Sequence, residues 1–485
     1  MTTTSSPPDR EVREHRPAVP SYDRRAHLSP TTRSWVAWAV IVLLALAAVE
    51  AVLLGLTRVV PAMQPQSVPA PGAWTYRAAA GAEAVVDDHG VRWPVATSLR
   101  GGRDVPVPSV ATGTASPQLY ETARVGARSW SVAVPTPGRY AVDLLVVQPD
   151  PAAPAGSDVF DVLAGDGVGT AVPLARGVEL VPGTALPQHV TGIVHVRSEE
   201  LTLEFFPVEG EAAVTGLVVS GLGEETPSTL LDEQFDGAAG APAPAPWTPV
   251  TGPGPFGDGE IQGYSDSGRH VALDGAGRLV LQAEPMPYPE PWTDAAGAQR
   301  LQPWTSARLE TKGRFSVTYG KVSARLQVPP GQGLWPAFWM LGADVDRNPW
   351  PVSGEIDVME HLGGDPATVY ASLRALGDEL DTPDSAGRRV SRLGTGWTSP
   401  EPLTEGLHTY SAELTPGYVT FAVDGRPVQT VSQVDLRRGQ QWPLGKPFYL
   451  ILNLAVGGTW GGPPDESTPV PARLLIDSVR VSGWP

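Results

Sequence analysis

The octapeptide Gly354-Glu355-Ile356-Asp357-Val358-Met359-Glu360-His361 places three carboxylates within six residues of an otherwise apolar, strand-like stretch. Side chains alternate between the two faces of a strand, so Glu355 and Asp357 point the same way, while a regular strand would turn Glu360 to the other face. One extra residue between Asp357 and Glu360, forming a β-bulge, would bring all three acids to one face, and such bulges recur beside active sites. The spacing therefore predicts a bulged strand that carries an acidic cluster.

The spacing alone leaves two interpretations of this cluster open. Acidic residues on strands commonly line a solvated face. Alternatively, four strand steps separate the Glu355 and Glu360 Cα atoms by about 13 Å. Side chains that lean inward can then bring the two carboxylates to roughly 5 Å, the separation used in retaining glycoside hydrolysis. Residues 333–340 (GLWPAFWM) lie just upstream, and their two Trp rings suit the flat faces of sugars, so this neighbour favours a sugar cleft.

The acid motif and the segments around it resemble glycoside hydrolase family 16, in particular its laminarinase-like members, whose motif is E-x-D-x-x-E. The other shared segments follow one another in the family's order, and they are residues 262–266 (QGYSD), 305–313 (TSARLETKG), 335–339 (WPAFW), 406–410 (GLHTY), 423–425 (VDG) and 452–460 (LNLAVGGTW). The resemblance implies a β-jelly roll of two stacked antiparallel sheets. It also implies that an open cleft on the concave sheet binds β-1,3-linked glucan and cuts it internally with retention of configuration.

On this resemblance Glu355 is the nucleophile, Glu360 is the acid/base, and Asp357 orients the nucleophile. The nucleophile must be ionised and the acid must be protonated near neutral pH, so two close carboxylates in different surroundings are required. Asp357 adds a third like charge, which raises the cost of ionising all three groups. A proton shared within the cluster is therefore expected.

The same segments supply six substrate-binding candidates, which are Trp335, Trp339, Arg308, Trp460, His361 and Asn453. The three Trp residues are expected to stack on sugar rings. A single Trp more often belongs to a core, but Trp460 falls in a Gly-rich loop, where a core role is less natural. Arg308 would contact sugar hydroxyls or the acids, with a surface salt bridge as the alternative. His361 could instead form a hydrogen bond within a loop.

The sequence departs from the family pattern in its predicted substrate contacts. A V-H-G-T-V-H run usually follows the acid motif, whereas this chain has VYASLR at residues 369–374, with Tyr370 and Arg374 in the two His places. Gly259 stands where the family usually has Asn, and residues 413–416 (ELTP) lack a Trp. These changes weaken the expectation of strict laminarin specificity.

The fourth departure concerns a metal. The chemistry itself requires no cofactor, but many family members hold a structural Ca²⁺ near their termini, and Ca²⁺ prefers oxygen ligands. The family's early D-E-F segment is EQF here, at residues 233–235, so one carboxylate is lost. Asp477 remains as a candidate ligand for a structural Ca²⁺.

Composition restricts the class of partner. The chain has 485 residues and a net charge of −17. Because phosphate binding needs clustered Lys and Arg, nucleic acid and anionic membrane surfaces are not expected partners, whereas a β-glucan polysaccharide is compatible. The absence of Cys excludes disulfides and thiolate metal sites. The 53 Gly and 52 Pro residues are typical of short strands joined by turns rather than of a helical protein.

The N-terminal residues predict a membrane anchor. Residues 1–34 are polar, include six Arg, and are expected to form a disordered cytoplasmic tail. Residues 35–56 are an apolar run that as a helix would span about 33 Å, enough to cross a hydrocarbon core of ~30 Å. The Arg excess before this run predicts a cytoplasmic N-terminus and an extracellular catalytic domain on a single-pass cell-membrane protein. A cleaved signal peptide is the alternative, although its apolar region is usually only ~7–15 residues.

The rest of the chain is predicted to be all-β. Residues 57–72 contain four Pro and are expected to be an extended linker. Residues 73–222 predict a smaller β-sandwich, and residues 228–485 predict one large jelly-roll sandwich. Residues 76–81 (YRAAAG) and 87–93 (DDHGVRW) are similar to motifs of malectin-type carbohydrate-binding modules. A purely structural spacer domain is the alternative for this segment.

Three functions compete on the sequence. The first is a membrane-anchored, retaining endo-β-1,3-glucanase, as the acid motif implies. The second is a hydrolase or transglycosylase for another β-glycan, such as a galactan, as the altered substrate contacts allow. The third is a surface glycan-binding protein without activity, against which the presence of all three acids argues.

Overall fold

The computed structural model of the chain describes residues 72–108, 114–166, 171–182, 187–223, 228–253, 259–293, 299–384 and 387–484. The expected tail, membrane helix and linker at residues 1–34, 35–56 and 57–72 lie outside these ranges, apart from Gly72. Within the ranges just given, no helix has both the length and the apolar character needed to cross a bilayer. Strands dominate the described residues, which confirms the predicted all-β fold class.

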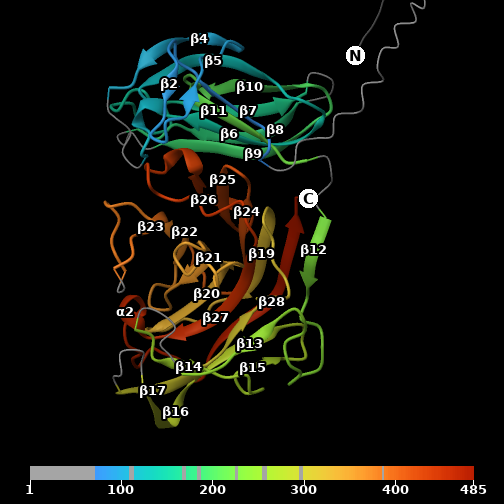
Figure 1. Cartoon of the computed structure of the whole chain (residues 1–485), viewed down its shortest axis with the longest axis vertical. Coiled ribbons are helices and arrows are strands. Elements are labelled where there is room, and N and C mark those ends of the chain that lie inside the picture. The colour runs from blue at the N-terminus through green and yellow to red at the C-terminus, as the bar shows by residue number, and fades with distance from the viewer. Residues whose placement is uncertain are drawn as a thin grey trace, which may run out of the picture. The chain divides into compact units, whose positions relative to one another are not determined.

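The N-terminal β-region, residues 72–223, is built from one antiparallel network (Figure 1). The strands described for it are β1 (Thr75–Ala79), β4 (Leu99–Pro106), β5 (Thr122–Ala133), β6 (Gly138–Val146), β7 (Val159–Gly165), β8 (Val172–Glu179), β9 (Gln188–Val196), β10 (Glu200–Glu209) and β11 (Ala213–Gly221), with a separate ribbon of β2 (Val85–Val86) and β3 (Arg92–Trp93) and a 3₁₀ turn at Pro117–Leu119. β6 and β11 pair with each other and are buried along nearly their whole length, which fits their mostly apolar sequences. The resemblance to malectin-type modules is not tested by this architecture and stays a prediction.

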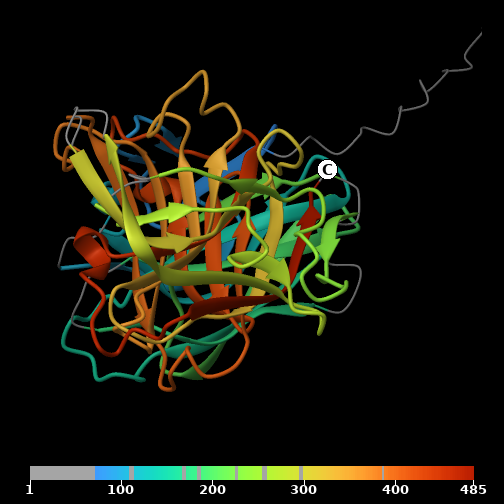
Figure 2. The ribbon, with the colours of Figure 1, turned by 90° about the horizontal axis from the view of Figure 1, so that it is seen from below.

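The C-terminal sandwich, residues 228–484, contains two large sheets. The first includes, among the described residues, β12 (Ser228–Glu233), β14 (Gln262–Tyr264), β15 (Val271–Leu273), β16 (Leu279–Thr293), β17 (Gln299–Ser306), β19 (Gly320–Gln327), β24 (His408–Leu414), β25 (Tyr418–Val423), β26 (Arg426–Ser432) and β28 (Ala472–Gly483). The second, here called the groove sheet, has the order β13 (Thr248–Val250), β18 (Arg308–Glu310), β27 (Phe448–Val456), β20 (Leu334–Gly342), β21 (Glu355–His361), β22 (Thr368–Leu376) and β23 (Val390–Thr398). Figure 2 shows orange and red strands of this sandwich side by side. The arrangement is jelly-roll-like, as predicted.

A single apolar cluster fills the space between these two sheets. It combines side chains that alternate along β19 and β28 of the first sheet with side chains from β20, β21 and β27 of the groove sheet. Ile356, Val358 and Met359 of β21 all enter it. The apolar face of each sheet packs into this core. Because side chains alternate along a strand, the polar side chains of the groove sheet lie on its opposite face.

The N-terminal β-region and the C-terminal sandwich meet at a polar junction. Both ring nitrogens of His189 face carboxylates, with Nδ1 2.7 Å from Asp143 Oδ1 and Nε2 2.8 Å from Asp435 Oδ2. Ser432 donates a hydrogen bond from Oγ to Asp143 Oδ2 at 2.7 Å. Burial alone would lower the pKa of His189, but the two carboxylates outweigh it and raise this pKa well above its usual value. His189 is therefore a buried cation that ties the two parts together.

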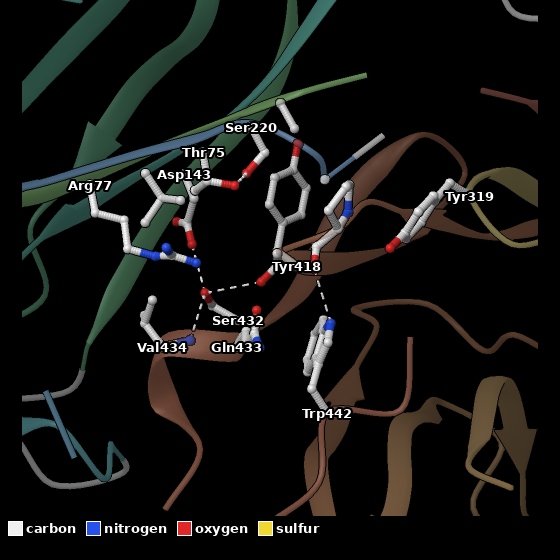
Figure 3. Close-up of a pocket in the computed structure, with 15 residues that line it drawn as sticks. Thr75, Arg77, Asp143, Ser220, Tyr319, Tyr418, Ser432, Gln433, Val434 and Trp442 are labelled. Atoms are coloured by element: carbon white, nitrogen blue, oxygen red, sulfur yellow. Dashed lines mark hydrogen bonds between the residues drawn. The ribbon is translucent and has the colours of Figure 1, made fainter. Parts of the chain in front are cut away.

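A cavity of about 190 Å³ lies beside this junction and is lined by side chains from both parts, which Figure 3 draws as sticks. The Tyr418 hydroxyl donates to the carbonyl of Gly192 at 3.2 Å, and Thr191 and Thr420 share a hydrogen bond of 2.9 Å. These bonds connect β9 directly to β25, so the junction is held by neutral contacts as well as by the buried cation.

Candidate active site

The bulge predicted from the odd spacing of the acids is present in β21. Pairing with β22 matches Asp357 to Ser372 and Glu360 to Tyr370, so one more residue lies on β21 than on β22 between these pairs. The pairing of β21 with β20 shifts at the same place. The prediction of a bulge is confirmed, and as its consequence Glu355, Asp357 and Glu360 all line one groove.

This groove has a volume of about 790 Å³ and lies on the polar face of the groove sheet. Its floor is formed by side chains from β20, β21, β22 and β27. Glu355, Asp357 and Glu360 are 8%, 2% and 5% exposed. The acids are therefore buried at the base of an open groove, which rules out the alternative that they line a solvated strand face.

Arg374 of β22 forms ion pairs with all three acids. Its Nε lies 3.4 Å from Glu355 Oε1 and 3.1 Å from Asp357 Oδ2, and its Nη2 lies 2.7 Å from Glu360 Oε2. This follows from the register, because Arg374 is the Cα partner of Glu355 on the neighbouring strand. Ser372, two residues before Arg374 and on the same face, donates from Oγ to Asp357 Oδ2 at 2.6 Å. One guanidinium thus bridges the whole acidic set.

Three carboxylates beside one guanidinium cannot all ionise cheaply in a buried site. Burial, and then the charge of Asp357, raise the pKa of Glu355 well above its usual value. Burial and the Asp357 charge also raise the pKa of Glu360, to about 8, although hydrogen bonds from Trp335 and Arg374 act in the opposite direction. The cluster therefore retains a proton at neutral pH, which agrees with the proton sharing expected for three neighbouring carboxylates.

Glu360 is held at both oxygens. Trp335 donates from Nε1 to Glu360 Oε1 at 3.2 Å, and Arg374 donates to Oε2 at 2.7 Å. These two donors fix the orientation of the carboxyl group in the groove. With a pKa of about 8, this oriented group can deliver a proton at neutral pH.

Three of the predicted substrate-binding residues come together along the groove floor. Trp339 donates from Nε1 to Asn453 Oδ1 at 2.6 Å, and the Arg308 guanidinium lies 4.9 Å from the centre of the Trp339 ring. Asn453 in turn donates to the Tyr264 hydroxyl at 3.3 Å. Arg308 also lies 3.7 Å from Glu310, so the predicted salt bridge and the groove position are both present.

Trp335 and Trp460 form an aromatic group with Tyr370. The ring centres of Trp335 and Trp460 are 5.0 Å apart, and those of Tyr370 and Trp460 are 4.8 Å apart, both in edge-on geometry. Trp460 belongs to the short helix α2 (Gly458–Gly461) and is 37% exposed. Its position beside the groove, rather than in the core, agrees with its Gly-rich surroundings.

Two predicted site residues are not brought to a site. His361 alternates with Glu360 on β21, so it points away from the groove. It is fully buried, and its Nδ1 lies 2.8 Å from the Thr368 carbonyl. Burial lowers the pKa of His361, which is therefore neutral. The prediction of a substrate contact for His361 is wrong, and the alternative of a local hydrogen bond holds.

Asp477, the predicted calcium ligand, pairs instead with Arg325, whose Nη1 lies 3.0 Å from Asp477 Oδ2. Across the described parts of the chain, no group of three or more His, Asp or Glu side chains is arranged to hold a metal ion. Because an arginine occupies the carboxylate and further acidic ligands do not gather there, the residues present do not fit a calcium site, and the calcium prediction is not supported.

Sequence reasoning missed the far end of the groove. Arg388 and Arg392, from β23 and the residues just before it, line the groove with Trp350. Arg392 is the Cα partner of Arg374. Alternation along β22 could have assigned Ser372 and Arg374 to the face of the acids, but the register that places Arg392 beside them is not visible in the sequence.

A bridged set of buried carboxylates in an open groove of a β-sandwich is the arrangement expected of a glycoside hydrolase. The model for glycosyl hydrolases family 16 matches residues 270–469. Over 270 residues the chain is 34% identical to a beta-glucanase of Rhodothermus marinus, covering 53% of this chain and 85% of that relative. It is 33% identical over 227 residues to a glucan endo-1,3-beta-glucosidase of Cryptopygus antarcticus, covering 45% and 77%.

A third relative has a different printed activity. This keratan-sulfate endo-1,4-beta-galactosidase of Sphingobacterium multivorum is 33% identical over 178 residues, covering 36% of this chain and 40% of that relative. Taken together, the comparisons and the site identify a glycoside hydrolase, and the chain belongs to glycosyl hydrolases family 16.

Proposed function

We propose that the protein is a retaining, endo-acting glycoside hydrolase that cleaves β-1,3-glucan by double displacement. The observation that carries the proposal is the bulge in β21, which turns Glu355 and Glu360 into one groove on either side of Asp357. The relative from C. antarcticus, named for cleavage of 1,3-linked glucan, supports this substrate.

In the first step, the ionised Glu355 attacks the anomeric carbon while Glu360 donates its proton to the departing glycosidic oxygen. The bond to that oxygen breaks, and a covalent glycosyl ester forms on Glu355. In the second step, Glu360, now a carboxylate, takes a proton from water as the water attacks the same carbon. The ester bond breaks, Glu355 is regenerated, and the configuration is retained.

Repulsion between the buried carboxylates supports a state in which one carboxyl group is protonated while the other is ionised. Once Glu355 has lost its proton, its negative charge makes ionisation of the nearby Glu360 harder still. Arg374 lies 3.4 Å from Glu355 and 2.7 Å from Glu360, so its charge lowers the pKa of both groups. In the proposed mechanism the retained proton is on Glu360, where it can protonate the leaving group.

The floor residues would hold the sugar chain. Trp339 presents a ring backed by Arg308, and Asn453 carries an amide in the same row. An apolar ring with polar groups beside it matches a pyranose, which has an apolar face and a rim of hydroxyls. Trp460, beside the groove, is positioned to extend this contact along the polymer.

A polysaccharide panel tests the proposal. Purified protein would be assayed for new reducing ends on laminarin, mixed-linkage β-glucan and a β-galactan. Early products would be sized to test endo-action, and their anomeric form followed by NMR to test retention. Turnover of laminarin by the wild type and its loss in Glu355→Gln are expected. No turnover on any polymer, or equal turnover by Glu355→Gln, would overturn the proposal.

A second candidate is hydrolysis or transglycosylation of another β-glycan, such as a galactan. Tyr370 and Arg374 occupy positions next to the acids that differ from the family pattern, and both contribute to the groove or its aromatic side. The relative named for galactosidase activity supports this candidate. A preference for galactan in the panel, or products longer than the starting oligosaccharide by mass, would favour it over the glucanase. Binding without cleavage of any polymer would instead indicate a glycan-binding protein.

We also propose that residues 35–56 anchor the protein in the cell membrane, with the hydrolase outside. The length of this apolar run and the Arg residues before it support the proposal. Protease added to intact cells should remove the hydrolase domain, and the remaining fragment should stay with the membrane fraction. Release of active protein into the medium would argue for cleavage instead.

A further inference from the structure

One end of the groove carries two neighbouring guanidinium groups. Arg374 on β22 and Arg392 on β23 are directly opposite Cα partners, and both line the groove. Like charges placed directly opposite each other on adjacent strands destabilise a sheet. The pair therefore needs negative charge nearby.

Among the described residues, carboxylates surround only one of these two guanidinium groups. Arg374 has three carboxylates around its guanidinium. Arg392 is exposed, and among the residues that the structure describes no ion pair or hydrogen bond reaches its side chain. A positive charge thus faces the groove without compensation, on the strand next but one to the strand that carries the acids.

Hydrogen bonds and a ring contact hold Arg388 in the wall beside Arg392. The Arg388 guanidinium donates from Nε to Asp384 Oδ2 at 2.7 Å and from Nη1 to the Trp350 carbonyl at 2.5 Å. It also lies 5.2 Å from the centre of the Trp350 ring. Because Asp384 neutralises Arg388, the uncompensated charge at this end belongs to Arg392, and Arg388 with Trp350 forms a fixed frame around it.

We propose that Arg392 anchors an anionic subsite, which binds a carboxylate or sulfate ester carried by the glycan. This inference rests on the proposed hydrolase function. Two strand spacings place the Cα atom of Arg392 about 10 Å from that of Glu355. The anionic group therefore lies on a sugar that neighbours the cleaved bond, not on the sugar that reacts.

The net charge of the whole chain limits how many anionic groups the glycan can carry. A net charge of −17 repels a densely charged polymer at long range. A single guanidinium can offset one anionic group held in charge-assisted hydrogen bonds, but not a continuous row of them. The ligand is therefore a sparsely substituted β-glycan, with an acidic group on occasional sugars.

The test compares neutral laminarin with lightly sulfated and lightly carboxymethylated laminarin of the same length. The proteins are the wild type, Arg392→Gln, and the matched control Arg473→Gln on β28 of the other sheet, which removes the same charge. For the wild type, kcat/KM should be about tenfold higher on a substituted polymer than on the neutral one, chiefly through KM. This ratio should fall toward one in Arg392→Gln and in high salt, and stay unchanged in Arg473→Gln.

The two substituted polymers show which anionic group is bound. A higher kcat/KM on sulfated laminarin would identify sulfate, and a higher kcat/KM on carboxymethylated laminarin would identify carboxylate. Equal kcat/KM on neutral and both substituted polymers, or a ratio unaffected by Arg392→Gln, would overturn the inference while leaving the hydrolase intact. If no polymer is cleaved, the hydrolase proposal fails. Calorimetric binding of the same neutral and substituted oligosaccharides, with and without Arg392→Gln, then decides the subsite separately, because an equal affinity for both would overturn it.

Discussion

Two buried charge clusters of similar composition lie in different parts of this molecule. Each has one basic side chain among carboxylates. The groove cluster consists of Glu355, Asp357, Glu360 and Arg374, and the junction cluster consists of Asp143, His189, Ser432 and Asp435. Both take up protons more readily when the protein is folded, but for different reasons.

In the junction cluster the proton completes the pairing, because it gives His189 the charge that its two carboxylates neutralise. In the groove cluster the proton relieves an excess, because three acids share one guanidinium. The first arrangement is satisfied and closed between two parts of the chain. The second has more negative than positive groups at the base of an open groove. Catalytic acids need shifted pKa values, and such an arrangement of buried like charges shifts them.

Glu355→Gln is expected to give the largest difference in activity between a variant of the groove cluster and a variant of the junction cluster. Loss of the attacking carboxylate should lower kcat on the best polymer by about 10⁴-fold or more, because Gln cannot form the glycosyl ester. Initial rates of reducing-end release would measure this loss. His189→Gln is the matched comparison and should keep near-wild-type rates, since His189 is remote from the groove sheet. A comparable loss in both variants would contradict the division of roles.

Arg374→Gln should change activity less, but it should move the pH profile. The guanidinium lowers the pKa values of Glu355 and Glu360, so its removal should raise both. The wild-type rate is expected to decline above about pH 8 as Glu360 loses its proton. In Arg374→Gln the acidic limb of kcat/KM should move to higher pH, and the maximum should fall by about 10²-fold. Arg374→Lys, which keeps the charge, should recover much of the acidic limb, and an unshifted profile would contradict the bridging role.

His189→Gln should destabilise the fold rather than the chemistry. The folded pKa of His189 is raised, so its contribution is fully present below the unfolded pKa of about 6.5 and is lost as the pH rises through the folded value. Removing the cation leaves two buried carboxylates unpaired, at a cost of about 3 kcal/mol. Urea unfolding at pH 6 and pH 9 should show the larger loss at pH 6. His195→Gln, an exposed change on the same strand, should have little effect at either pH.

Glu360→Gln should have the opposite effect on stability. The folded pKa of Glu360 is about 8, above its usual 4.5, so the wild type loses stability as the pH rises from 4.5 to 8. An amide has no proton to lose, so the variant should be more stable than the wild type by roughly 4 kcal/mol at pH 8 and nearly equal at pH 4. Thermal unfolding across this range would measure the difference. Glu401→Gln, at an exposed position, should show no such trend.

Local patterns in the sequence were sufficient for much of the fold and for the acids. Residues 320–327, 418–423 and 448–456 are rich in β-branched, aromatic and other apolar residues, and they form β19, β25 and β27. The bulge followed from three acids in an apolar strand, because only an extra residue gives them a common face. Each of these features depends on neighbours within a few positions.

The remaining features depend on register and on pairing over long distances in the chain. In the sequence Arg374 stands out only as a departure from a motif, because its bridge to the acids depends on the register that pairs it with Glu355. The junction cluster unites residues 143, 189 and 435, whose proximity no local pattern encodes. His361 was misplaced because its nearness to Glu360 in sequence hides the alternation that sends it to the other face.

The bulge in β21 also shows that two different spacings of the acids can place them on one face. Val358 and Met359 both face the core, so many apolar replacements there would leave the acids where they are. Loss of a single codon between Asp357 and Glu360 would remove the extra residue, and regular alternation would then put all three acids on the groove face without a bulge. A relative with that shorter spacing would therefore keep the same three acids in one groove with a regular strand.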